Sequence, residues 1–160
     1  METALHLGSL SSLLALCYQD LKDRHIAVYL IVIALLTTAL IFAQQVPLHI
    51  YLLHSVQNIL IIAFLLAIIW LYARLKFKRP LNEVFGLGDA LFFTIPALSF
   101  PRTSFLLLFV GSLIFSLVLF SVLKARFKEK TVPLAGLQAL FFALVLGLNW
   151  CLNLSNLYLV

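Results

Sequence analysis

Long apolar stretches separated by short clusters of basic residues are the feature that most constrains the fold of this chain. Charged residues make up 11% of its 160 residues and the mean hydropathy is +1.12, whereas soluble proteins carry about 25% charged residues. Only α-helices and closed barrels satisfy their backbone hydrogen bonds in lipid. A barrel would need alternating segments of about ten residues, but these stretches are continuously apolar. The sequence therefore predicts one all-α domain, residues 1–160, built as a polytopic membrane helix bundle in the lipid bilayer.

Six stretches are candidate membrane spans, since a helix needs about 20 apolar residues to cross a bilayer. Four of them are clear: Ile26–Ala43, Ile50–Tyr72, Phe105–Leu123 and Leu134–Leu154. Two are weaker, because Leu5–Gln19 is short and Phe85–Phe100 contains two glycines, Asp89 and Pro96. Hydropathy alone does not decide whether these two stretches cross.

The basic residues favour a crossing by Phe85–Phe100, whereas Leu5–Gln19 is counted as a span because Asp20 closes it and because Glu2 and His6 are the only acidic or basic residues before that aspartate. Ten of the eleven lysines and arginines fall into three clusters: Lys22 and Arg24; Arg74, Lys76, Lys78 and Arg79; Lys124, Arg126, Lys128 and Lys130. Basic loops stay in the cytoplasm, so Phe85–Phe100 must cross if the second and third clusters are to share that side. The pattern predicts six transmembrane helices with both termini outside. Asp20 and Asp89 then lie on the cytoplasmic side of a multi-pass plasma membrane protein.

Asp20 and Asp89 are the candidate catalytic residues. A charged side chain at mid-bilayer costs about 2.5–3.5 kcal/mol even on the lower scales, so an acid bordering an apolar segment is a functional hypothesis by default. Two neighbouring carboxyl groups share a proton and titrate as a unit. One could take a proton from water while the other donates to a scissile carbonyl. Gly86 and Gly88, which precede Asp89, would let the backbone bend and a substrate strand approach.

Three short motifs resemble those of the type IV prepilin peptidases, which are GxGD membrane aspartyl proteases. They are Asp20-Leu21-Lys22-Asp23-Arg24-His25-Ile26, Gly86-Leu87-Gly88-Asp89 and Val132-Pro133-Leu134-Ala135-Gly136. The resemblance implies an endopeptidase that cleaves leader peptides from prepilin-like membrane proteins at the cytoplasmic face. It assigns catalysis to Asp20 and Asp89, and makes Arg24 and Pro133, with the two glycines, substrate-binding or site-shaping residues.

The chain departs from this family in two respects. Many members carry a lysine two residues after the GxGD aspartate, where this chain has Leu91. The larger bifunctional members have a methyltransferase region with paired CxxC motifs, whereas this chain has only Cys17 and Cys151. We therefore expect a minimal, peptidase-only form that needs no cofactor or metal and binds no nucleic acid. The sequence indicates no oligomeric state.

Two other functional classes remain open. The first is a non-catalytic membrane scaffold or partner-binding relative on the same fold, which Leu91 favours. The second is a small ion-coupled transporter, whose acids usually lie near the midplane and in repeated halves. The predicted depth of the two aspartates and the lack of an internal repeat argue against a transporter.

Several polar residues have simpler interpretations. Asp23 lies three residues from Asp20, on a similar helical face, and is its rival as the first carboxylate. We interpret Glu83 as a solvated charge in a loop. His54, Gln57 and Asn58 interrupt an apolar stretch, and we expect them to make interhelical hydrogen bonds.

Overall fold

The computed structural model describes residues 2–77, 86–123, 132–152 and 157–158, which form helices and contain no strand. The elements are α1 (Glu2–Asp23), α2 (Val28–Gln45), α3 (Leu48–Tyr72) with its π-helical continuation η1 (Ala73–Phe77), α5 (Leu87–Phe92), α6 (Thr94–Ser99), α7 (Arg102–Leu123) and α8 (Leu134–Leu152). The all-α class predicted from the sequence is confirmed for these residues. Glu83, Lys78, Arg79 and the third basic cluster lie outside them.

Four of the six predicted spans are supported by length and composition. They are α2, α3 continued to Lys76, α7 and α8. With 22 residues, α1 is about 33 Å long, but its charged residues make it more polar than these four helices. Together α5 and α6 cover only Leu87–Ser99. The predicted span ends Phe85 and Leu154 lie outside the described residues.

Three helices begin directly after a proline. Pro47, Pro101 and Pro133 precede α3, α7 and α8, and each proline carbonyl accepts the backbone N–H of the residue four positions on, at 3.0, 2.8 and 3.1 Å. Proline suits this place because its fixed φ favours a turn, while its missing N–H would break a helix interior. These residues therefore separate the long apolar runs into distinct helices.

A fourth proline interrupts the segment that follows Gly86. The sequence predicts that this segment is the least regular helix, frayed at its first residues and bent near Pro96. The structure confirms the irregularity, with Gly86 outside the helix and a break between α5 and α6 at Phe93. The physical reason is that Pro96 has no N–H for the carbonyl of Phe92 and its ring would clash with that carbonyl.

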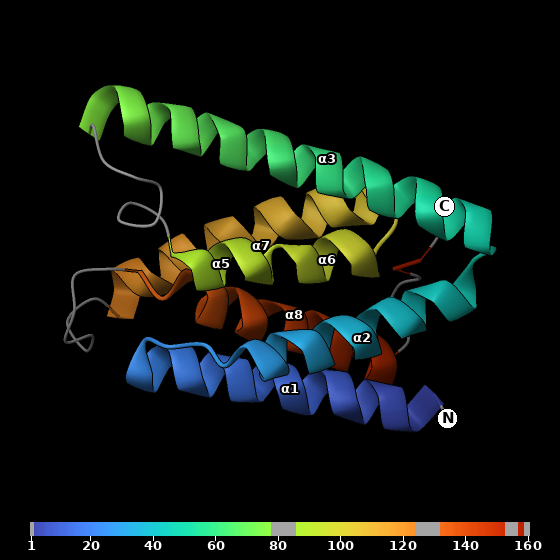
Figure 1. Ribbon diagram of the computed structural model, residues 1–160. Coiled ribbons are helices and arrows are strands. Elements are labelled where there is room, and N and C mark those ends of the chain that lie inside the picture. The colour runs from blue at the N-terminus through green and yellow to red at the C-terminus, as the bar shows by residue number, and fades with distance from the viewer. Residues whose placement is uncertain (1, 78–85, 124–131, 153–156, 159–160) are drawn as a thin grey trace.

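The most extensive packing between two described helices joins α1 to α8. Figure 1 shows α8 in the middle, with α1 on one side and α5, α6 and α7 on the other. Helix α1 also packs extensively against α2, and further contacts join α2 to α6 and α7 to α8. Fully buried aromatic rings fill the interior: Phe42, Phe92, Phe93, Phe100, Phe105 and Phe142.

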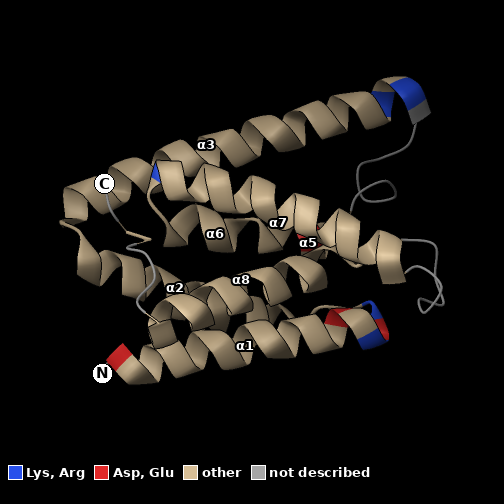
Figure 2. Cartoon of the chain, turned by 180° about the vertical axis from the view of Figure 1, so that it is seen from behind, with Lys and Arg blue, Asp and Glu red and all other residues tan. Residues whose placement is uncertain are grey.

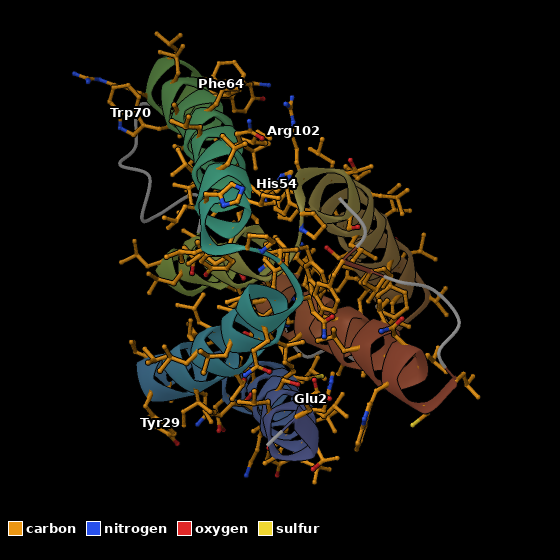
Figure 3. The ribbon with its side chains drawn as sticks, turned by 90° about the vertical axis from the view of Figure 1, so that its right-hand side faces the viewer. Glu2, Tyr29, His54, Phe64, Trp70 and Arg102 are labelled. Carbon is orange, nitrogen blue, oxygen red and sulfur yellow. The ribbon has the colours of Figure 1, made fainter. Side chains whose placement is uncertain are left out.

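In contrast, α3 lies at the periphery. Its buried residues are Ser55, Asn58 and Ile62, and none lies in its last ten residues. The Asn58 amide donates to the carbonyls of Ala97 and Phe100 at 3.0 and 2.9 Å, where α6 ends. His54 accepts the backbone N–H of Arg102 at 3.3 Å, and Figure 3 shows these two residues side by side, with Phe64 and Trp70 pointing outward. The predicted interhelical role is thus confirmed for His54 and Asn58.

Replacing Asn58 with leucine should destabilise the protein. The variant would leave two buried carbonyls at the end of α6 without their donor, which costs about 1–3 kcal/mol. We expect a lower midpoint of thermal unfolding in detergent micelles. The matched control is Gln57→Leu on the same helix, which should change the midpoint little. Equal effects of the two variants would contradict this role of Asn58.

Candidate active site

Asp20 lies near the end of α1, with its side chain turned into the bundle. It is only 6% exposed, and its Oδ2 accepts the backbone N–H of Gly136 at 2.7 Å. This N–H belongs to the first turn of α8, where backbone N–H groups have no partner within the helix. Asp20 therefore caps a helix distant from its own in sequence.

Asp89 is the third residue of the short helix α5. An acid at this position often reaches back to cap its own helix. Instead, Asp89 Oδ1 accepts the backbone N–H of Ala135 at 2.8 Å. The half-buried Asp89 thus reaches the same first turn of α8 as Asp20.

The two carboxyl groups consequently lie side by side. Their hydrogen-bond donors belong to consecutive residues, whose Cα atoms are about 3.8 Å apart. Asp20 and Asp89 also interact electrostatically with each other, and Arg24 interacts with both. Figure 2 shows the end of α1, the start of α5 and the basic end of α3 at one end of the bundle, opposite the N-terminus. The prediction that both aspartates lie at the same end is confirmed.

Two glycines allow the backbone to approach these carboxyl groups. A Cβ on Gly136 would lie 2.8 Å from both Cβ and Oδ2 of Asp20, and a Cβ on Gly86 would lie 2.9 Å from Asp89 Oδ2. Such distances are shorter than real Cβ contacts. Gly88 has a different role, since its Cβ would meet Ile26 Cδ1 at 3.2 Å. It lets the start of α5 pack against the loop that follows α1.

That loop also brings Arg24 to the site. Arg24 directly follows α1 and has a φ of 55°, a left-handed conformation that is uncommon for residues other than glycine but frequent just after a helix end. The loop is held by the backbone N–H of Ala27, which donates to Gln19 Oε1 at 3.1 Å. The turn therefore places a cation beside two acids.

The remaining predicted residues have distinct places. Pro133 is buried and directly precedes α8, so it fixes where the first turn begins. Asp23, the rival of Asp20, is exposed on the last residue of α1. Leu91 is 44% exposed, and Glu83 lies outside the described residues.

The backbone donors of Ala135 and Gly136 were not predicted from the sequence. The signal was present in the motif, because two small residues follow Pro133 where α8 begins. Among the described residues, no group of three His, Cys, Asp or Glu side chains could hold a metal ion.

The arrangement leaves each carboxyl group one oxygen for other partners. Asp20 uses Oδ2 and Asp89 uses Oδ1 toward α8. Two adjacent acids, each with a second oxygen, can hold a water molecule and exchange a proton with it.

Asparagine and alanine should affect stability differently at these two positions. Alanine removes the acceptor of an N-terminal amide, which costs about 1 kcal/mol, whereas the asparagine oxygen can still accept. We expect Asp20→Ala and Asp89→Ala to lower the unfolding midpoint in micelles more than the corresponding asparagine variants. The control Asp23→Ala should leave it nearly unchanged. If both alanine variants are as stable as the parent, the hydrogen bonds to α8 contribute nothing to stability.

Comparisons with known proteins add no relative. The chain matches no protein-family model, no curated protein and no solved structure.

Proposed function

We propose that this chain is a membrane aspartyl endopeptidase whose catalytic pair is Asp20 and Asp89. The observation that carries the proposal is the capping of two consecutive α8 amides by acids from two different helices. An acid pair assembled from distant segments at one end of an apolar bundle suits proton transfer to and from water.

The chemistry needs one carboxylate and one carboxylic acid. Neighbouring like charges do not ionise together easily, so the pair would hold one proton between them. The ionised member takes a proton from water while the protonated member donates to the scissile carbonyl oxygen. Water attacks the carbonyl carbon, and the tetrahedral intermediate collapses with protonation of the leaving amine. The same pair can supply each proton, so no cofactor is required.

The substrate class follows from the motif resemblance. We propose that the substrates are prepilin-like membrane proteins, cleaved after a short leader at the cytoplasmic face. In this proposal α1 and the α5–α6 segment join the four longer apolar helices as spans, giving six crossings with both termini outside. The basic residues at the ends of α1 and α3 favour this orientation.

A non-catalytic scaffold is the second candidate. It is favoured by the same hydrogen bonds, since each acid already caps α8 and negative charge at a helix N-terminus is stabilising in itself. In a scaffold the acids would only hold helices together. Conservative variants separate the two functions, because asparagine can cap the helix but cannot supply the proton chemistry.

Cleavage should require both aspartates. A membrane-embedded precursor with a basic leader is incubated with each variant at matched membrane levels. Losing a general acid or base costs about 10²–10⁴-fold, so Asp20→Asn or Asp89→Asn should reduce cleavage by that factor. The double variant should be little worse than either single one, because the two residues act as a unit.

The control for this experiment is Asp23→Asn, which removes a nearby exposed acid and should keep cleavage close to the parent level. Substantial cleavage by Asp89→Asn would exclude the aspartyl mechanism. Loss in Asp23→Asn with retention in Asp20→Asn would show that Asp23 is the first carboxylate.

The proposed orientation can be tested by cysteine labelling. In a Cys151→Ser background, where the remaining native Cys17 is buried, one cysteine is introduced in place of His25 or Lys76 at the basic end, or of Gln45 or Thr103 at the opposite end. A membrane-impermeant maleimide added to intact cells should label only the second pair. Labelling of the first pair alone would reverse the orientation and place the acids outside.

A further inference from the structure

The separation of the two acids is fixed by a third element rather than by their own helices. Asp20 and Asp89 each accept a hydrogen bond from a backbone amide of α8. The two donors are consecutive members of one helical turn, which is rigid. The first turn of α8 therefore acts as a template for the distance between two acceptors that come from different parts of the chain.

Gly136 is the residue on which this template depends. An added Cβ would lie 2.8 Å from the Asp20 Cβ and 3.2 Å from its Cγ. The Asp20 Cβ is fixed by its backbone and cannot rotate away, so relief would require α1 and α8 to move apart. That movement lengthens the hydrogen bond from the Gly136 N–H.

The backbone amides at the start of α8 also affect the ionisation of the two acids. The unpaired N–H groups of a first turn carry the positive end of the helix dipole. They stabilise negative charge on the pair as a whole, in addition to holding its geometry. Displacing Asp20 from Gly136 would therefore alter both the position and the ionisation of the pair.

We propose that the first turn of α8 is the positioning element of the catalytic pair, and that Gly136 is its positioning residue. This inference rests on the proposed aspartyl peptidase function. Gly136 acts through Asp20 and touches no substrate. Its replacement should therefore impair the chemical step more than substrate binding.

The kinetic test compares Gly136→Ala with Gly147→Ala. Gly147 lies on the same helix and also faces α1, but its added Cβ would meet Leu10 Cδ2 at an ordinary 3.6 Å. A misplacement of about 1 Å can cost about 100-fold in rate, so Gly136→Ala should lose about 100-fold in kcat with little change in KM. The kcat of Gly147→Ala should stay within about threefold of the parent value. Comparable activity of the two variants would overturn the inference while leaving the peptidase function intact.

A spectroscopic test probes the hydrogen bond between Gly136 and Asp20 and does not depend on a cleavage assay. The chain contains only 6 glycines, so glycine-selective ¹⁵N labelling in micelles gives a simple amide spectrum that Gly→Ala variants can assign. The Gly136 amide should resonate at low field and shift more than the others in Asp20→Asn, but not in Asp23→Asn. A Gly136 resonance whose chemical shift does not change in Asp20→Asn would overturn the inference.

The two readouts separate the possible failures. If the parent protein cleaves no precursor, the proposed function fails, and the glycine spectrum still decides whether α8 positions the acids. If Gly136→Ala does not fold, the Gly→Ala variants of the other glycines assign the Gly136 resonance by elimination, and its shift in Asp20→Asn decides the question.

Discussion

The unpaired backbone N–H groups at the start of α8 are the constraint on which the rest of the site depends. In an apolar surrounding, a polar group without a hydrogen-bond partner is costly, and in lipid no water replaces it. The chain meets this requirement with acids from α1 and α5 rather than with a residue of α8 itself. A local need of one helix terminus thus determines how three helices converge.

The same requirement explains the polar residues elsewhere in the interior. The carbonyls at the end of α6 receive the Asn58 amide, and Ser99 on α6 donates to Thr38 of α2 at 2.7 Å. On α7, Ser112 accepts the Gln138 amide at 3.2 Å. Each of these bonds joins two helices where the surrounding contacts are apolar. Such bonds give direction to packing that dispersion forces alone leave unspecific.

Much of this fold was predictable because its signals are local. Proline positions and apolar runs anticipated the starts of α3, α7 and α8, and Pro96 anticipated the irregular segment. The exact break at Phe93 and the peripheral place of α3 were not predictable, since they depend on which side chains meet in three dimensions. Composition also separates α1 from the four clear spans, because the charges that mark its end make it more polar.

The residues of the candidate site likewise fall into those that local sequence signals predict and those that only the three-dimensional packing reveals. Asp20, Asp89 and their common end of the bundle followed from motifs and basic clusters. The donors Ala135 and Gly136 did not. Every residue except proline has a backbone N–H, so the sequence does not mark which of these groups bonds to an acceptor in another helix. Only the small size of these residues hinted at a close approach.

The break at Phe93 also divides the segment into parts of unequal local stability. Helix α6 buries Ile95, Pro96, Ala97 and Ser99, whereas α5 buries only Phe92. A helix of six residues is not stable by itself, and segments with few buried contacts open at lower free energy than the whole protein. Amide hydrogens of α5 should therefore exchange with solvent through small local openings. Those of α6 should exchange more slowly, because they require larger openings. The acid carried by α5 therefore sits on the half of this segment that opens more readily.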